Sequence, residues 1–334
     1  MKSFPAFKLV RMALAIGALV ALWLKVQRTH PLERLAGARL EFIALAVVVV
    51  ILDGMARAWN WRQLIRSMHV APTVGYGMVL RLFWSGAFLG QVVPSTAGTD
   101  ALRAILASRA FGGRMSEHAA AVVVLNIVSL AAGCAVGLGV AAWLFATDPQ
   151  HGVRPILVLL FAAALGAALI LYYLVHSQRG VLLWVLRRMR GPAMKVRRPL
   201  RRFTQRLIVL ERHHIGLLPI LAVAVLTLVT RATMFGLIGY ATGIVLPAGV
   251  WASLVPGNML SGLIPYSVAG YGGDQAAMVY FVTAFGISAG AAVAFALILP
   301  LMAMTFNMLG GLFVMSDHGA SRSAIQVPER PAAD

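Results

Sequence analysis

The chain has 334 residues, of which 60% are hydrophobic and only 12% are charged, and its formal net charge is +18. An ordinary soluble domain has about a quarter of its residues charged, so this composition excludes a water-soluble globular protein and indicates an all-α polytopic membrane protein. The basic residues lie at the ends of apolar runs and in one loop, which is typical of membrane topology signals and argues against nucleic acid as a partner.

Apolar runs along the chain predict about six spanning helices. A span needs about 20 mainly apolar residues, because only the helix itself can satisfy its backbone hydrogen bonds inside the hydrocarbon. The first run lacks a small-residue cleavage site, which favours a retained span over a signal peptide. The predicted spans cover residues 9–26, 40–59, 118–146, 154–175, 215–245 and 286–315.

Two further apolar stretches, 74–93 and 252–265, end in clusters of Pro and Gly and predict re-entrant hairpins. Three crossings separate them, so they would enter from opposite faces, as the inverted repeats of transporters do. The alternative is a pair of ordinary helix ends punctuated by Pro and Gly. The matched positions are Pro94, Gly98 and Asp100 in the first stretch and Pro265, Gly270 and Asp274 in the second.

The loop at 177–214 is rich in arginine, with Glu211 as its only acid, and the positive-inside rule places it in the cytoplasm. This orientation predicts a multi-pass protein of a bacterial inner membrane with both termini in the cytoplasm. The loop is either a solvated linker or an amphipathic segment on the inner leaflet. We expect one transmembrane domain over 1–315 and a polar, disordered tail at 316–334.

Several charged residues fall inside apolar segments. Arg231 lies near the middle of the run 215–245, where a charge costs at least about 2.5–3.5 kcal/mol on insertion scales, so it must face a cavity or a partner. Arg81, inside the first hairpin, invites the same interpretation. Asp53 and Arg57 lie four residues apart near a helix end, and we expect them to neutralise each other and snorkel.

The first Pro-Gly cluster is followed by a predicted short helix, with Thr99 as its N-cap and Asp100 as its first residue. The free N–H groups at a helix N-terminus bind anions, and Arg103, one turn further on, can pair with phosphate in a bidentate manner. Asp100 would hold that arginine or recognise a cationic headgroup. The alternative is a capped helix with Arg103 in water.

Catalytic signatures are missing from the sequence. There is no HExxH zinc motif, no Walker loop and no GxSxG nucleophile elbow. The single cysteine, Cys134, has no intrachain partner for a disulfide. We therefore expect no enzyme activity, no metal site and no cofactor.

Three segments carry a resemblance to a known family: AWNWRQLIRSMHV, GAFLGQVVPSTAGTDALRAILASRAFG and SGLIPYSVAGYGGDQAAMVYFVTAFGIS. They resemble the flippase-like membrane region of lysylphosphatidylglycerol synthases and its stand-alone relatives, over nearly the whole chain. The Gly-Gly-Asp and Arg of that family correspond to Gly98, Thr99, Asp100 and Arg103. Where its second turn has Arg-Glu, this chain has Gly273, Asp274 and Gln275, so the second cation is missing.

The resemblance implies a protein that handles lipids without synthesising them, since the soluble aminoacyl-transferase domain of the fused proteins is not seen in this sequence. The chain is similar to the branch of the family that is associated with hopanoid or isoprenoid lipids. We expect a translocator that holds an anionic lipid headgroup and moves it by alternating exposure of the hairpins. The sequence leaves open the lipid, the direction, the energy source and the oligomeric state. The candidate lipid-binding residues are Arg81, Pro94, Gly98, Asp100, Arg103, Arg231, Pro265, Gly270, Asp274 and Gln275.

Two other functions remain open at this stage. The protein could be a membrane scaffold that anchors a lipid-synthesis enzyme through its basic loop. It could also be an intramembrane transferase with Asp100 or Asp274 as base, although no donor site is recognisable in the sequence.

Overall fold

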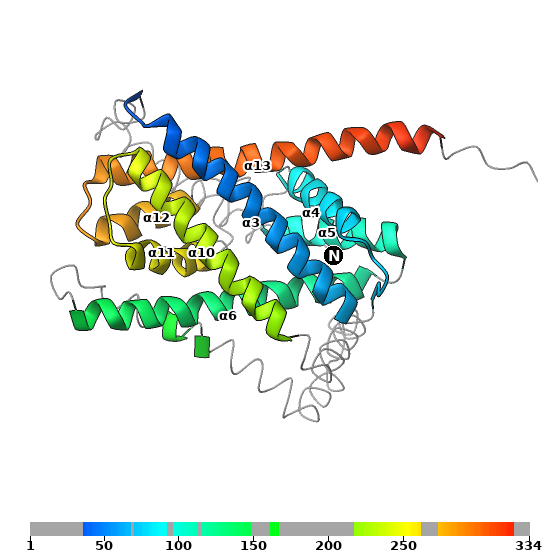
Figure 1. Cartoon of the computed structure of the whole chain (residues 1–334), viewed down its shortest axis with the longest axis horizontal. Coiled ribbons are helices and arrows are strands. Elements are labelled where there is room, and N and C mark those ends of the chain that lie inside the picture. The colour runs from blue at the N-terminus through cyan, green and yellow to red at the C-terminus, as the bar shows by residue number, and fades with distance from the viewer. Residues whose placement is uncertain are drawn as a thin grey trace, which may run out of the picture.

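The computed structural model describes residues 36–67, 70–91, 96–112, 115–147, 161–163, 165–166, 217–261 and 273–323. Throughout this part the regular structure is helical, which confirms the all-α prediction (Figure 1). The main helices are α3 (Leu40–Ser67), α4 (Tyr76–Gly90), α5 (Thr96–Phe111), α6 (Met115–Thr147), α10 (Leu217–Ala241), α11 (Ala248–Ser261), α12 (Gly273–Ala284) and α13 (Ala289–Ser323).

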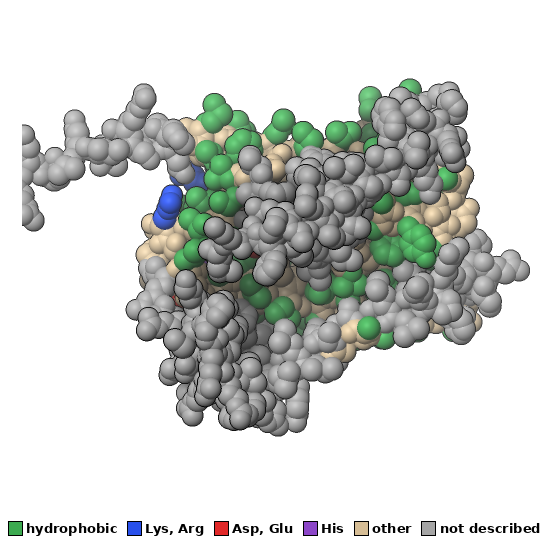
Figure 2. Space-filling model, turned by 180° about the vertical axis from the view of Figure 1, so that it is seen from behind, with side chains coloured by type: hydrophobic (Ala, Val, Ile, Leu, Met, Phe, Trp, Pro, Cys, Tyr) green, Lys and Arg blue, Asp and Glu red, His purple; other side chains and the backbone are tan. Residues whose placement is uncertain are grey.

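Four of these helices are long and apolar enough to cross a membrane: Leu40–Ser67, Met115–Trp143, Pro219–Ala241 and Ala289–Met315. They correspond to four of the six predicted spans. The predicted spans at 9–26 and 154–175 lie outside the described residues, apart from short helical pieces at 161–163 and 165–166. Hydrophobic side chains are spread over much of the described surface seen in Figure 2, as expected of a surface that faces lipid.

The helices form two units with the same order of lengths. The first unit runs long, short, short, long over α3, α4, α5 and α6, and the second repeats that order over α10, α11, α12 and α13. In Figure 1 a half turn about the viewing direction brings one unit onto the other. Because this axis is perpendicular to the long helices, the two units have inverted topology, as the sequence predicted.

The two units meet first along α3 and α10, which pack side by side over their whole length. The amide of Arg39, just before α3, donates to the carbonyl of Ala241 at the end of α10 over 3.2 Å. Near the other end, the Asn60 side-chain amide donates to the carbonyl of Ile220 over 3.1 Å. The start of one helix therefore meets the end of the other, and the pair is antiparallel.

Each unit also packs its first short helix on the last long helix of the other unit: α4 packs on α13, and α11 packs on α6. Glycine makes both contacts close. A Cβ on Gly137 of α6 would lie 2.6 Å from Pro256 of α11, and one on Gly310 of α13 would strike the Trp84 carbonyl of α4. Gly310 lies 173 residues after Gly137, and Pro256 lies 172 after Trp84, so the same contact is made twice.

Two boundaries differ from the prediction. Helix α5 begins at Thr96 and not after Thr99, so Thr99 is no N-cap; its hydroxyl lies 3.5 Å from the Gly90 carbonyl of α4. Asp100 and Arg103 thus lie in the second turn of α5, away from its N-terminus. At the other end of the chain, α13 continues through Ser323, past the expected domain boundary at 315.

Candidate functional site

The first centre of the site is the carboxylate of Asp53 in α3. Its Oδ2 lies 3.7 Å from Nε of Arg231 in α10 and 3.9 Å from a terminal nitrogen of Arg57 in α3. The Thr230 hydroxyl lies 2.9 Å from Asp53 Oδ1 and 3.0 Å from the Thr227 carbonyl, and can donate to either. Both arginine pairs are longer than a hydrogen bond, so Asp53 holds two cations loosely.

The second centre is the carboxylate of Asp100 in α5. A terminal nitrogen of Arg103, one turn further along the helix, donates to its Oδ1 over 3.0 Å. The Asn126 side-chain amide of α6 donates to the other oxygen over 2.6 Å. Arg103 is therefore a buried, paired side chain, and the alternative with Arg103 pointing into water is wrong.

Phe83 of α4 joins the two centres. Its buried ring lies 4.2 Å from the guanidinium carbon of Arg103 and 5.4 Å from that of Arg57, measured to the ring centroid. Both distances suit cation–π attraction, which strengthens when the cation is desolvated. Arg57 is also within electrostatic range of Arg231, Arg103 and Asp100. The five charged groups therefore act as one cluster.

This cluster, defined as Asp53, Arg57, Asp100, Arg103 and Arg231, has more positive charge than negative. With both carboxylates ionised, three arginines against two aspartates leave a net charge of +1. Each guanidinium carries five N–H donors, and Nε of Arg103 is buried with no hydrogen-bond partner among the described residues. The cluster therefore lacks acceptors, and an anion would supply both the missing charge and the missing oxygens.

The cluster lies at membrane depth. Arg231 is twelve residues from Pro219 and ten from Ala241, the ends of its candidate span. Asp53 is similarly central in the span Leu40–Ser67. Charges at this depth are costly unless they face partners or a polar cavity, and they mark ion and substrate pathways. The expectation that Asp53 and Arg57 only snorkel is wrong, because both belong to this central cluster.

Glycine in α4 makes room for the cluster. A Cβ on Gly86 would lie 2.5 Å from Cγ of Arg103 and 3.4 Å from its Cα. Helix α5 can therefore approach α4 closely, with the aliphatic part of Arg103 against the Gly86 backbone. This contact directs the guanidinium toward Phe83 and Asp100.

The structure brings together three of the residues predicted from sequence, Asp100, Arg103 and Arg231. Arg81 lies elsewhere, with its guanidinium carbon 5.9 Å from the Phe313 ring centroid of α13. Gln275 is buried near the start of α12. Gly98 and Asp274 belong to α5 and α12, without described side chains, whereas Pro94, Pro265 and Gly270 lie outside the described residues.

Sequence reasoning missed Asp53, Arg57, Phe83, Asn126 and Thr230. The rule that flagged Arg231, a charge deep in an apolar run, applies equally to Asp53 and Arg57 and would have found them. Phe83, Asn126 and Thr230 have no such signal, since only the folded arrangement shows what they touch. Among the described residues, no group of three or more His, Cys, Asp or Glu side chains could hold a metal ion.

Comparison with known proteins places the chain in a family. The model of the lysylphosphatidylglycerol synthase TM region matches residues 10–311, which is most of the chain. No curated protein matches it. The matched range contains the first unit, the second unit as far as residue 311 of α13, and the whole charged cluster. The chain is therefore a member of the lysylphosphatidylglycerol synthase TM-region family, a multi-pass and lipid-related membrane protein.

Proposed function

We propose that this protein is a lipid translocator of the bacterial inner membrane, which carries a lipid with an anionic headgroup between leaflets or membranes. The single observation behind the proposal is the cluster of three arginines and two aspartates near the middle of the spans. A headgroup that crosses a bilayer must pass this depth, and the net positive charge favours phosphate or carboxylate there.

The loose pairs at Asp53 suggest how the headgroup is held and released. Arg231 and Arg57 share one carboxylate at 3.7 and 3.9 Å, so a phosphodiester can bind them without breaking a short hydrogen bond. Arg103 is held more firmly by Asp100, at 3.0 Å, and is the fixed part of the site. Conduction needs binding that is favourable but weak enough to reverse, and loose counterions provide it.

In this proposal, translocation depends on movement of the two inverted units against each other. The cluster draws residues from α3 and α10, the antiparallel pair at which the two units meet. Rocking of one inverted unit against the other exposes a central site alternately to the two sides. The lipid tails, phospholipid or isoprenoid, would stay in the bilayer while the headgroup crosses.

A reconstitution experiment tests this function. The purified full chain is placed in liposomes that contain a fluorescent phosphatidylglycerol or, as the matched zwitterionic lipid, a fluorescent phosphatidylcholine. Dithionite then quenches the label in the outer leaflet. We expect the protein to speed the loss of protected phosphatidylglycerol well above empty liposomes, and to do so more than for phosphatidylcholine.

Equal rates with and without protein, for both lipids, would contradict translocation. That outcome would favour a membrane scaffold for a lipid-modifying enzyme. Chemical conversion of the labelled lipid, seen by chromatography after the assay, would instead show an enzyme and would overturn the inference that the protein acts by transport alone.

A further inference from the structure

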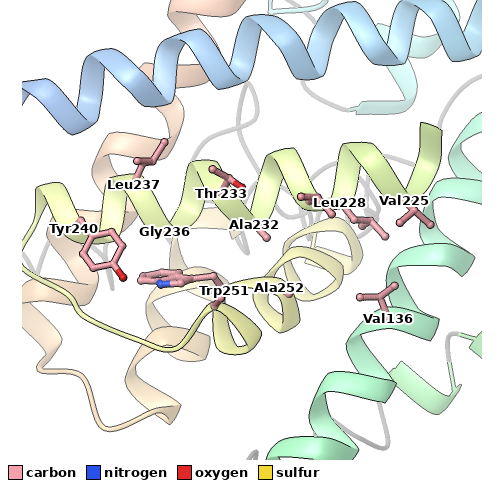
Figure 3. Close-up of a pocket in the computed structure, with 12 residues that line it drawn as sticks. Val136, Val225, Leu228, Ala232, Thr233, Gly236, Leu237, Tyr240, Trp251 and Ala252 are labelled. Atoms are coloured by element: carbon pink, nitrogen blue, oxygen red, sulfur yellow. The ribbon is translucent and has the colours of Figure 1, made fainter. Parts of the chain in front are cut away.

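The second unit has an apolar groove where the first unit has charges. The groove has a volume of about 380 Å³ and lies along α10 between α6 and α11 (Figure 3). Val225 and Val229 line it, and they come 172 residues after Asp53 and Arg57. The same positions of the inverted repeat therefore carry an ion pair in α3 and two lipid-exposed valines in α10.

The groove is separate from the charged cluster. Val229 and Arg231 are two residues apart in α10, which puts their side chains on nearly opposite sides of the helix. Arg231 meets Asp53 of α3, whereas Val229 lies on the side of α11 and α6. Among the residues that the structure describes, no Asp, Glu, Lys or Arg lines the groove. An apolar cavity of this kind does not hold ordered water, so its ligand is hydrocarbon.

The length and depth of the groove fit one acyl chain. Its lining extends along α10 from Val225 to Tyr240, which lies one residue before the end of the candidate span. At a rise of about 1.5 Å per residue, the fifteen steps from Val225 to Tyr240 span roughly 22 Å. One leaflet contributes about 15 Å of hydrocarbon, half of a core of about 30 Å. The groove therefore runs from the membrane interface past the end of one leaflet.

The interface end of the groove carries a hydrogen-bond donor without an acceptor. Trp251 of α11 is only 3% exposed, and its indole N–H has no partner among the described residues. Figure 3 shows its ring under α10, at the same end as Tyr240. The ring fits there because a Cβ on Gly239 would collide with it. Trp and Tyr favour the headgroup level of a membrane, where the ester carbonyls of glycerolipids provide acceptors.

We propose that this groove binds one acyl chain of a glycerolipid that stays with the protein. The ester carbonyl accepts from the Trp251 indole N–H, and the chain runs past Ala232 and Ala252 to Val225. This lipid is distinct from the one that the charged cluster handles, so the site goes beyond the proposed function and does not depend on it. The groove is a resident-lipid site that stabilises the packing of α10 on α6 and α11.

Photolabelling of the full chain tests the site. The protein is reconstituted in vesicles of phosphatidylcholine that include a phosphatidylcholine with a diazirine in its acyl chain, and labelled peptides are mapped by mass spectrometry. We expect labelling to concentrate on α10 and α11 around the groove. Ala232→Phe, which fills the groove, should remove most of this labelling, whereas Val48→Phe on the lipid-exposed face of α3 should leave it intact.

Trp251→Phe keeps an aromatic ring and removes the donor, so it should lower groove labelling by roughly fivefold, the factor of one neutral hydrogen bond. Ala252→Leu is a second groove-filling variant in case Ala232→Phe fails to fold. Arg231→Gln should leave groove labelling unchanged, which separates this site from the translocation site. Three results would overturn the proposal. The first is uniform labelling of all lipid-exposed helices, and the second is labelling that neither groove-filling variant lowers. The third is a set of carbene crosslinks which shows that another part of the chain fills the groove.

Discussion

The two helical units carry different kinds of side chain at matching positions of the repeat. Asp53 and Arg57 in α3 correspond to Val225 and Val229 in α10, and Arg103 in α5 corresponds to Gln275 in α12, each at an offset of 172 residues. The close glycine contacts between the units, Gly137 with Pro256 and Gly310 with Trp84, are related by nearly the same offset. Helix packing is thus shared between the units, whereas the charged cluster takes four of its five residues from the first unit and only Arg231 from the second. A symmetric scaffold carries an asymmetric site.

The asymmetry has a physical consequence for stability. The charges of the cluster are stable because each has a partner of opposite sign, and removal of one partner leaves a charge uncompensated at membrane depth. The second unit buries apolar side chains such as Phe235, Trp251, Phe281 and Phe295. A single substitution therefore cannot exchange the charged arrangement of one unit for the apolar packing of the other without a loss of stability.

The largest effect is expected from Asp53→Asn. The change leaves Arg57 and Arg231 near each other without a carboxylate, and an uncompensated charge near the middle of a span costs about 2.5–3.5 kcal/mol. Thermal unfolding in detergent should show a clearly lower midpoint. The double variant Asp53→Asn with Arg231→Gln should recover part of the loss. An unchanged midpoint for the single variant would mean that Asp53 does not hold the arginines.

Val229→Arg places a charge at the position that matches Arg57, but in the apolar unit. Val229 is 56% exposed in the middle of α10, so the arginine would face lipid at a cost of roughly 3 kcal/mol. Yield of inserted protein should fall, whereas Val229→Leu should be nearly neutral. If the arginine were tolerated as well as the leucine, this side of α10 would line a water-filled cavity, and the comparison between the units would fail.

Gly310→Ala tests the shared packing. The new methyl group would strike the Trp84 carbonyl, and overpacking of this kind typically costs about 1–3 kcal/mol. Gly139→Ala in α6 is the matched control, because nothing lies within 4 Å of its Cβ position, and alanine there should stabilise the helix slightly. Equal unfolding midpoints for the two variants would show that α4 and α13 do not pack as closely as described.

Gly86→Ala should have the smallest effect on stability and a visible effect on activity. Its methyl group pushes Arg103 away from Phe83 and Asp100, so translocation of phosphatidylglycerol should fall several-fold while the protein remains folded. Gly77→Ala on the same helix has open space around it and should leave the rate unchanged. Full activity of Gly86→Ala would show that the position of Arg103 does not matter for translocation.

Much of the fold could be predicted from sequence, because hydrophobic length and Pro-Gly punctuation determine spans and breaks directly. The four long helices and the inverted repeat followed from those signals. The start of α5 was placed too late, because Thr99 has the chemistry of an N-cap and the helix nevertheless extends to Thr96. Cap propensity is a local preference, and the contact of Thr99 with Gly90 of α4 is a tertiary one.

The site was predicted only in part. Depth in an apolar run identified Arg231, and the motif after the first Pro-Gly cluster identified Asp100 and Arg103. No such signal identified their partners. Asp53 and Arg57 were explained as a local pair, since sequence spacing shows a neighbour four residues away and cannot show Arg231, 178 residues further on from Asp53. Which cations share a carboxylate is decided by the antiparallel packing of α3 on α10.

The central claim is that the cluster binds an anionic headgroup as it crosses the membrane, and Arg231→Gln tests it most directly. The translocation rate of fluorescent phosphatidylglycerol is compared between this variant and Arg109→Gln, which removes the same charge from the exposed last turn of α5. Loss of one charge-assisted contact should slow Arg231→Gln by about tenfold or more, with Arg109→Gln at the wild-type rate. Equal rates for the two folded variants would contradict the account.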